Sequence, residues 1–408
     1  MFEIVYSLFL LSGIIKSFWN AIFMLPQPVD MTLLLGLILV VLYIPRFIKD
    51  MMVRNKLYVA ASSFPLLTTM SVFFAWMVIT VVFTKSTGYC YEKLLLFLPN
   101  LIAFILPLLY IKFRPRWFLR FHVYAATGLS LLFAYYYPKI LQFEIQLDEE
   151  GFAKGYLTIG YISGLTIAML LFLDFGLKKP VRFALILLNA WVMMICGGRG
   201  PLFFLALVVL LKLMVKLSHV KKLSLRLSFK RIIVALTAVA VIVFGAYYVI
   251  DKYSVSLERS LFRFSQLLDA ETDDSVTKRL SYIQFSFDKI FADVGNVLFG
   301  SGIGSFGIMY SGEDGRDYPH NILLEIWFEL GLTGVALFIL YISFYLKKVR
   351  FNSPLLYPFL YIVLNSLKSS SFTDLRIMFG FFSIFLLYDA LMKRNNPQSD
   401  FGSTTNAS

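Results

Sequence analysis

The sequence has few charged side chains. They make up only 15% of its 408 residues, whereas soluble domains carry about 25% charged residues. This shortage excludes a fold whose whole surface faces water. Hydrophobic residues instead account for 59% of the chain, and its mean hydropathy is +0.74. The composition therefore predicts an integral membrane protein.

Cysteine and histidine are also scarce. The two cysteines, Cys90 and Cys196, share no motif, so neither a disulfide framework nor a thiolate metal site is expected. The three histidines, His122, His219 and His320, lie far apart in the sequence, which argues against a histidine-rich metal site. We expect no metal ion and no cofactor.

The chain does contain a series of apolar runs, many of them close to the length of about 20 residues that crosses a hydrocarbon core. In lipid, each backbone N–H and C=O must be bonded within its own segment, so these runs are expected to be helices. They predict an all-α membrane protein with about 12 transmembrane helices. The expected helices cover 4–24, 31–46, 62–84, 94–111, 118–137, 157–175, 181–197, 201–217, 231–250, 319–341, 354–367 and 376–391.

The two ends of the chain differ in character. The first apolar run follows Glu3 and no basic segment, so we expect a retained membrane helix and not a cleaved signal. Residues 1–394 then form a single polytopic membrane domain. The polar tail 395–408 is rich in turn-forming residues and is expected to be disordered on the cytoplasmic side.

The formal net charge of +13 raises the question of nucleic acid binding, but the basic residues are placed as membrane topology requires. They gather in connections on one side of the expected helices, which in membrane proteins is the cytoplasmic side. These connections are 46–56, 112–120, 178–182, 212–231, 347–350 and 393–394. Both termini are therefore expected in the cytoplasm, and no nucleic acid partner is expected.

One long connection, 251–318, falls on the expected outer side. Within it, the apolar residues of 275–291 recur at helical spacing, which predicts a short amphipathic helix lying against the membrane face. Arg279 lies on this helix. Its side chain either neutralises an anionic group or pairs with acidic neighbours on a solvated face.

The outer connection 197–201 has the sequence Gly-Gly-Arg-Gly-Pro. Its glycines allow close backbone approach, and Pro201 suits the first turn of a helix. Arg199 then lies at a helix start, where a positive charge opposes the helix dipole. A bound anion would relieve that mismatch. The alternative is an arginine that extends to the lipid headgroups.

A second glycine-rich stretch, 300–307, precedes His320 and Asn321 at the start of an expected helix. Amides such as those of Gly302 and Gly304 can bind phosphate, but the dinucleotide and P-loop fingerprints require a preceding strand that is lacking here. His320 is the one histidine on the expected outer face. Because an imidazole titrates near neutral pH, His320 is a candidate to abstract or donate a proton.

Glu325 and Glu329 lie one helical turn apart inside the same expected membrane helix. Ionisable side chains are costly in lipid and usually face the interior of a helix bundle. The two carboxyl groups either support the candidate site or are held near the interface by a structural hydrogen bond.

The spacing of these motifs resembles a known family. A His-Asn pair at 320–321, nine residues and then Gly-x-x-Gly at 331–334 follow a long outer loop with clustered glycines. This pattern, with the Gly-Arg-Gly-Pro connection ahead of a basic cytoplasmic loop, resembles the O-antigen ligase and repeat-unit polymerase superfamily. The likeness runs from about Trp191 to Tyr341, and the expected helix layout extends it over the chain.

Members of this superfamily transfer a glycan from an undecaprenyl diphosphate carrier, without a nucleotide sugar or a metal. The resemblance implies that Arg199 and a loop arginine neutralise the diphosphate, for which planar guanidinium groups are suited. Arg279 fits the loop arginine, and its competitors are Arg259, Arg263 and Arg316. His320 would take the proton from the acceptor hydroxyl as that hydroxyl attacks and inverts the anomeric carbon. Further substrate contacts are expected from Asn321, Gly302 and Gly304.

We therefore interpret the chain as a polymerase of lipid-linked repeat units for a bacterial surface polysaccharide, such as O antigen, capsule or exopolysaccharide. It would lie in the inner membrane, surrounded by membrane lipids, with its site on the periplasmic face. A chain-length regulator and a flippase are further candidate partners. Two alternatives stay open: a ligase that transfers the glycan to lipid A–core, and a transporter that flips lipid-linked glycans. Paired broken helices in two repeated halves are not evident in the sequence, which favours an enzyme over a transporter.

Overall fold

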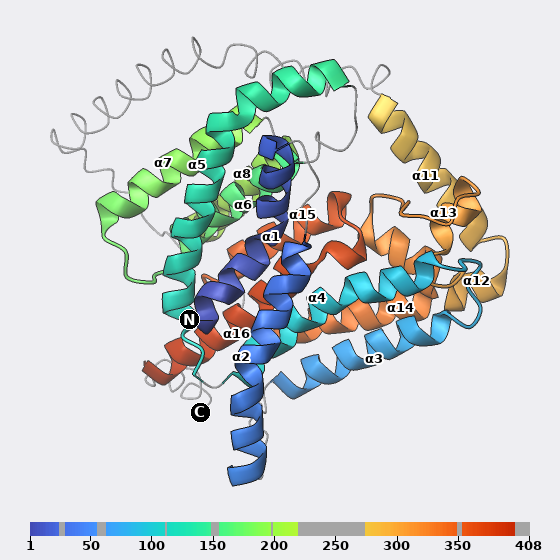
Figure 1. Ribbon diagram of the computed structural model, residues 1–408, viewed down its shortest axis with the longest axis horizontal. Coiled ribbons are helices and arrows are strands. Elements are labelled where there is room, and N and C mark those ends of the chain that lie inside the picture. Colours follow the sequence, from blue (N-terminus) through green and yellow to red (C-terminus); the bar gives the residue numbers. More distant parts are fainter. Residues whose placement is uncertain are drawn as a thin grey trace.

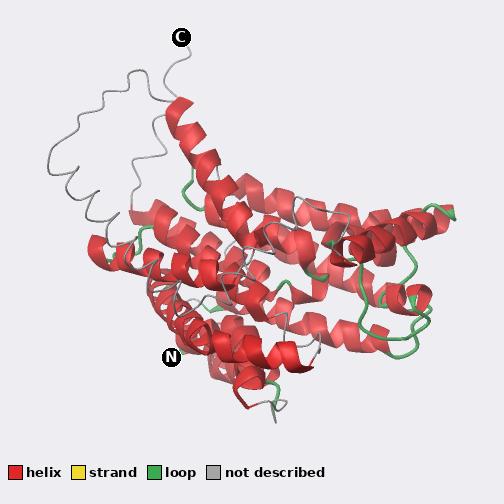
Figure 2. Ribbon diagram, turned by 90° about the horizontal axis from the view of Figure 1, so that it is seen from above, coloured by secondary structure: helices red, strands yellow, loops and turns green. Residues whose placement is uncertain are grey.

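The computed structural model describes residues 1–23, 29–54, 63–110, 112–147, 155–196, 199–218, 274–348 and 353–395. Within these ranges the backbone forms α-helices, one 3-10 helix and loops (Figure 1, Figure 2). The all-α prediction is therefore confirmed for the described part of the chain.

The helices are α1 (Phe2–Phe23), α2 (Met31–Arg54), α3 (Phe64–Thr80), α4 (Tyr89–Leu109), α5 (Pro115–Leu147), α6 (Gly155–Phe172), α7 (Lys179–Cys196), α8 (Arg199–Ser218), α11 (Asp274–Ile290), α12 (Val294–Phe299), α13 (Ser305–Tyr310), α14 (Ile322–Lys348), α15 (Leu356–Ser369) and α16 (Arg376–Asn395), with the 3-10 helix η3 (Phe372–Asp374) between the last two.

Each helix expected from an apolar run has a counterpart, except 231–250, which lies outside the described residues, as does the tail 396–408. The expected amphipathic helix corresponds to α11. α2 and α5 are longer than expected and continue to Arg54 and Leu147. The reason is that hydropathy marks only the part of a helix inside the hydrocarbon, whereas residues of good helix propensity extend the backbone beyond it.

Several helices are apolar enough to lie in lipid. Three of the described helices have both the length and the composition of a membrane span, over Met31–Lys49 in α2, Tyr89–Leu109 in α4 and Ile322–Lys347 in α14. Shorter apolar helices cover Phe64–Thr80, Leu157–Phe172 and Gly200–Val215. Together these helices indicate an integral membrane protein.

The helices pack around a core rich in aromatic side chains. α16 packs against α4, α5 and α15 (Figure 1). Tyr345, Phe359 and Phe382 lie with their ring centroids 4.3–4.8 Å apart and join α14, α15 and α16. Such rings bury large apolar areas. They fix the relative positions of α14, α15 and α16.

A smaller apolar cluster fastens α11 and α13 to the first half of α14. It contains Tyr282 and Ile290 of α11, Phe306 of α13, and Leu324 and Phe328 of α14. Figure 1 shows α11, α12 and α13 gathered at this end of α14. The described part of the long connection, which begins at residue 274, is therefore packed onto α14.

α14 is broken at Gly331, whose backbone has φ 69° and ψ −174°. A Cβ atom at this position would lie 2.4 Å from the carbonyl oxygen of Leu298, so only glycine allows the approach. A Cβ atom on Gly300 would likewise lie 2.5 Å from the carbonyl oxygen of Glu329. The break in α14 is thus the place where the chain after α12 touches the backbone of α14.

Three carbonyl groups beside the break accept hydrogen bonds from outside α14. The donors are the Ser301 amide to Phe328 (2.8 Å), the Gly302 amide to Glu329 (3.0 Å) and the Trp76 indole to Leu330 (2.8 Å). A backbone carbonyl left without a donor would be costly inside a membrane. The break is therefore stabilised by a loop and by α3, and it joins both to α14.

Candidate active site

His320 lies in the short loop before α14 and has a φ of 53°. A left-handed backbone at a residue other than glycine costs on the order of 1–3 kcal/mol. The imidazole packs against two tyrosine rings, with centroid distances of 4.4 Å to Tyr318 and 5.9 Å to Tyr282. Strained backbone of this kind is concentrated at functional sites. The conformation therefore supports His320 as a candidate functional residue.

Asn321 caps α14. Its Oδ1 accepts a hydrogen bond from the amide of Leu324 at 3.1 Å, and its carbonyl oxygen accepts one from the amide of Glu325 at 2.9 Å. Asparagine is a favoured residue at this position because it satisfies an amide of the first turn. The cap fixes the start of α14 and hence the position of the adjacent His320. The expected contact of Asn321 with a glycan stays a prediction.

α11 brings Arg279 to the same end of α14. Arg279 is half-buried and lies one turn before Tyr282, and residues three apart share a helix face. The Tyr282 hydroxyl lies 3.3 Å from a carboxylate oxygen of Asp317 and donates to it, while its ring packs against His320. The structure therefore brings the helix of Arg279 and the loop of His320 together.

Arg316 forms an ion pair with Asp374. Its Nη2 atom lies 3.0 and 2.8 Å from the two carboxylate oxygens. The attraction of that carboxylate raises the pKa of Arg316 above its usual value. The two side chains are 51% and 44% exposed, so the pair adds little to stability. Arg316 is an alternative to Arg279 as the arginine that binds an anionic ligand. In this conformation, however, its guanidinium already pairs with the carboxylate of Asp374.

Arg199 begins α8, but its side chain and residues 197–198 lie outside the described part of the structure. The next residue, Gly200, is buried, and a Cβ atom on it would lie 2.7 Å from the Nζ atom of Lys368. Lys368 belongs to the last turn of α15. Gly200 therefore lets a second cationic residue approach the start of α8. Sequence reasoning missed Lys368 because nothing in the sequence connects it with a helix start so far away along the chain.

The connection from α15 to α16, residues 370–375, is called the strap below. Its hydrogen bonds run from Asn100 Nδ2 to the carbonyl oxygens of Phe372 (3.3 Å) and Thr373 (2.9 Å), and from the Ser371 hydroxyl (2.7 Å) and the Phe372 amide (3.0 Å) to the carboxylate of Glu325. Lys368 precedes the strap, and Asp374 within it holds Arg316. The strap thus connects the start of α8 with the loop that carries Arg316 and His320.

Glu325 and Glu329 are completely buried and face Lys93 of α4. The Lys93 Nζ atom lies 2.7 Å from an oxygen of each carboxylate. Sequence reasoning missed Lys93 because it lies one residue before the expected span 94–111. The signal that could have identified it is a lysine at the expected outer end of a membrane helix, where basic residues are depleted.

The glycine loop, residues 300–307, packs against the connection between α3 and α4. Gly302 and Gly304 have φ values of 91° and 73°, and a Cβ atom on Gly302 would lie 2.4 Å from the Cα atom of Thr84. The amides of Gly302 and Gly304 donate to the carbonyl oxygen and to a carboxylate oxygen of Glu329, both at 3.0 Å. These amides are therefore engaged inside the protein in this conformation. Their contact with substrate stays a prediction.

Asp314 fastens the connection between α3 and α4 to the loop before α14. Its carboxylate accepts hydrogen bonds from the Ser86 hydroxyl at 2.6 Å, the Gly88 amide at 2.7 Å and the Thr87 amide at 2.9 Å. Burial opposes the charged form, but these hydrogen bonds outweigh it and lower the pKa of Asp314 from 3.8 to about 2. The ionised carboxylate therefore stabilises the folded loops.

Asp314→Asn should lower the free energy of unfolding in detergent at pH 7 by about 1–3 kcal/mol, because the amide is neutral and turns an N–H toward backbone donors. A carboxyl group whose pKa is lowered by folding stabilises the protein above its unfolded pKa. The difference from wild type should therefore be complete at pH 7 and shrink as the pH falls from about 4 toward 2. Thermal melting at several pH values measures it. The control is Glu313→Gln, an exposed neighbouring carboxylate. Equal melting of Asp314→Asn and wild type at pH 7 would contradict the prediction.

The residues gathered here suit an anionic ligand better than a metal ion. In the described ranges, no three His, Cys, Asp or Glu side chains come together in a way that could hold a metal. Cationic residues on the elements described above are Arg279 on α11, Arg316 before α14 and Lys368 at the end of α15. Planar or flexible cationic side chains of this kind bind phosphate and carboxylate groups.

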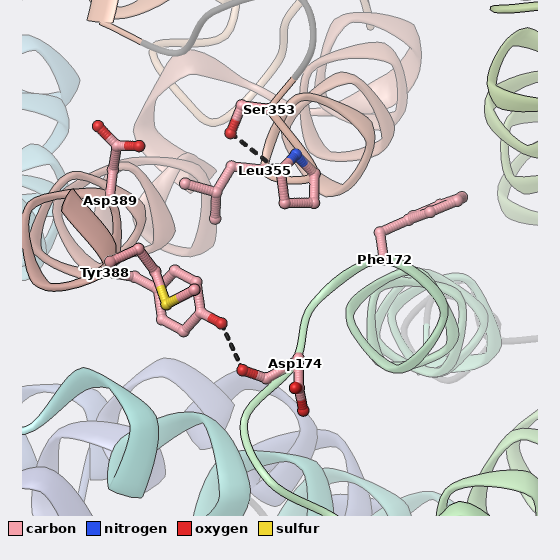
Figure 3. A pocket seen from close by; sticks show the side chains of 8 residues that line it. Phe172, Asp174, Ser353, Leu355, Tyr388 and Asp389 are labelled. Carbon is pink, nitrogen blue, oxygen red and sulfur yellow. Dashed lines mark hydrogen bonds between the residues drawn. The ribbon is translucent and has the colours of Figure 1, made fainter. Parts of the chain in front are cut away.

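A cavity of about 200 Å³ lies away from these residues. Asp174, Ser353, Tyr388 and Asp389 are among its lining residues (Figure 3). The Tyr388 hydroxyl donates to the carbonyl oxygen of Asp174 at 2.5 Å. The cavity adjoins the beginning of α15 and the later part of α16, whereas the strap joins the opposite ends of these helices. It is therefore no part of the candidate site.

These observations indicate an integral membrane protein in which α11, the loop of His320, the start of α14 and the strap come together. Residues 184–339 match the family model described as O-antigen ligase. The matched segment includes Arg199, Arg279, His320 and Gly331, whereas Lys93 and the strap lie outside it. No curated protein matches the chain.

The resemblance inferred from the sequence motifs is therefore confirmed for residues 184–339. Members of this family transfer lipid-linked glycans.

Proposed function

We propose that the protein is a bacterial inner-membrane polymerase of repeat units for a surface polysaccharide. The donor would be the growing glycan on undecaprenyl diphosphate, and the acceptor a sugar hydroxyl of a single lipid-linked repeat unit. The observation that carries this proposal is the position of His320 at the start of a broken membrane helix, beside the helix of Arg279, within a segment that matches O-antigen ligase.

The proposed reaction is an inverting displacement. The acceptor oxygen forms a new bond to the anomeric carbon while the bond from that carbon to the diphosphate oxygen breaks. His320 takes the proton of the acceptor hydroxyl, since an imidazole is an effective general base near neutral pH. Arg199 and Arg279 stabilise the charge that develops on the departing diphosphate. A diphosphate is already a good leaving group, so the proposed mechanism needs no paired carboxylic acid of the glycosidase type.

The proposed orientation follows from the basic connections and is directly testable. A reporter that is active in the cytoplasm should be active when fused after Ser408, because the proposed arrangement has both termini inside. A reporter that requires export should be active when inserted at Asp273 in the long loop. The reverse pattern would put His320 on the cytoplasmic side and remove the basis of the proposed site.

The break in α14 at Gly331 is the observation that bears on the alternative of a transporter of lipid-linked glycans. Transporters often use discontinuous helices whose unwound carbonyls bind ions. Here, however, the carbonyls of Phe328, Glu329 and Leu330 accept hydrogen bonds from Ser301, Gly302 and Trp76. Because these acceptors are occupied within the protein, the break supports an enzyme with a fixed site better than an ion-coupled transporter.

Reconstitution separates the proposed polymerase from the ligase alternative. Purified protein in proteoliposomes is supplied with a lipid-linked repeat unit alone, or with the same donor and lipid A–core. A polymerase gives a ladder of longer lipid-linked glycans in both cases. A ligase gives only a glycan attached to lipid A–core, and that result would overturn the proposal. The proposed partners, a chain-length regulator and a flippase, would alter the length distribution or the supply of substrate.

A further inference from the structure

Lys93 lies completely enclosed between two carboxylates that hold different parts of the outer structure. Its Nζ atom is 2.7 Å from Oε1 of Glu325 and 2.7 Å from Oε1 of Glu329, and all three side chains have no exposed surface. The second oxygen of Glu329 accepts the amide of Gly304 at 3.0 Å, in the glycine loop. The second oxygen of Glu325 accepts the amide of Phe372 at 3.0 Å, in the strap.

Stability alone gives no reason for such a cluster. Removing charged groups from water is costly, and well-packed apolar side chains often stabilise a protein as well as a buried ion pair does. Buried hydrogen bonds to charged groups do add geometric specificity, because each carboxylate oxygen fixes the position of its donor. In this cluster every one of the four carboxylate oxygens accepts a hydrogen bond. The cluster therefore specifies the positions of the segments that bond to it.

Those segments surround the candidate site. Glu325 and Glu329 lie on one face of α14 in the two turns after His320, because residues four apart share a helix face. The glycine loop leads through α13 to the loop of His320. The strap holds Arg316 through Asp374. A displacement of either segment would therefore move groups around the imidazole.

The strap also reaches the other half of the proposed diphosphate site. Lys368 precedes it in α15 and approaches Gly200 at the start of α8, beside Arg199. The strap donates two hydrogen bonds to Glu325. These bonds therefore fix the strap directly after the end of α15, which approaches α8, the helix of Arg199. In this way one buried cluster connects the two proposed sides of the reaction, the arginine side and the histidine side.

We propose that Lys93 is a positioning residue for glycan transfer, acting through Glu325 and Glu329 to hold the strap and the glycine loop in register with His320. It touches no substrate itself. This inference rests on the proposed function for its catalytic consequence, whereas its structural consequence is independent of the reaction. Lys93 lies outside the segment that matches the family.

The test combines amide hydrogen exchange with kinetics on the full-length protein in nanodiscs or proteoliposomes. In the double variant Lys93→Met with Glu329→Gln, one charge of each sign is lost, so the net charge of the cluster does not change. We expect exchange in 300–307 and in the strap to become at least about tenfold faster. We expect kcat for glycan transfer to fall by about 10- to 100-fold, since a misplacement near 1 Å can cost that much, with KM changed far less.

Two single variants make the test specific. Glu329→Gln should accelerate exchange at Gly304 and leave Phe372 protected, whereas Glu325→Gln should do the reverse. Each keeps one ion pair of Lys93, so both remain informative if the double variant does not fold. The control is Ser7→Ala with His122→Leu, which removes another buried polar contact, at 2.9 Å between α1 and α5, away from both segments. It should leave exchange in both segments and kcat unchanged.

Several results would overturn the inference. Wild-type kcat in the folded double variant would mean that the cluster only adds stability. Unchanged exchange in both segments would mean that the cluster does not hold them. A wild-type protein that transfers no glycan under any condition would refute the proposed function and with it the catalytic consequence. The exchange measurements would still decide whether Lys93 holds the two segments.

Discussion

Replacing His320 should abolish glycan transfer while leaving the lipid-linked repeat unit on the outer leaflet. As a general base His320 should contribute about 10²- to 10⁴-fold to the rate. Because His320 has a φ of 53°, His320→Asn is the cleaner change: asparagine tolerates the left-handed backbone and has no basic nitrogen. His320→Ala should give the same kinetic loss together with a lower melting temperature.

The assay measures polymer length and, in intact spheroplasts, the lipid-linked repeat unit that a membrane-impermeant label reaches. The enzyme proposal requires short or absent polymer and an accumulated, labelled intermediate. An intermediate that stays on the inner leaflet would indicate a flippase that uses His320 for binding. Normal polymer in His320→Asn would show that His320 has no catalytic role and serves only the structure of the loop before α14.

The course of the chain could largely be predicted from hydropathy. The expected spans that fall within the described residues correspond to helices, because a helix is the only way for a single segment to satisfy its backbone groups in lipid. Two features were beyond that reasoning. The extension of α5 to Leu147 depends on helix propensity outside the hydrocarbon. The break at Gly331 depends on a close contact with Leu298, and hydropathy contains no information about contacts between distant segments.

The candidate site could be predicted only in part. His320, Arg199 and Arg279 could be selected because each belongs to a motif with recognisable spacing or to an amphipathic pattern. Lys93 and Lys368 belong to no motif. They become relevant only through residues brought close by the tertiary fold, Glu325 and Gly200 among them. A lysine near the end of an apolar run is normally an interfacial residue. The unusual outer position of Lys93 is visible in the sequence, but its pairing with Glu325 and Glu329 is not.

The glycine-rich stretch 300–307 shows how one pattern allows two physical explanations. Sequence reasoning considered these glycines as a source of amides for phosphate. The structure has Gly302 and Gly304 in left-handed conformations, with amides that donate to Glu329. Glycine is required here for backbone conformation and for close approach to Thr84. A glycine whose amide binds phosphate and a glycine that is needed for its backbone conformation look the same in a sequence. Only the structure shows which acceptor each amide binds.

Arg199→Lys should reduce polymer formation by about 10²- to 10³-fold, the loss typical of removing one donor from a charge-stabilising site. Lysine keeps the positive charge at the start of α8 and can still extend to lipid headgroups. It lacks the planar pair of donors that grips a diphosphate oxygen pair. The protein level in the membrane should not change. Polymer length and the rate of transfer in proteoliposomes measure the effect.

The matched control for this prediction is Arg114→Lys, an exposed arginine in the connection 112–120, which is expected on the cytoplasmic side. There the charge alone is expected to matter, so polymer formation should be unchanged. Equal activity of Arg199→Lys and Arg114→Lys would show that Arg199 serves only as an interfacial cation. If only Arg199→Lys loses activity, its kinetic constants show which of two roles the guanidinium has. A higher KM means that the guanidinium binds the diphosphate in the ground state, and a lower kcat means that it stabilises the charge that develops as the diphosphate departs.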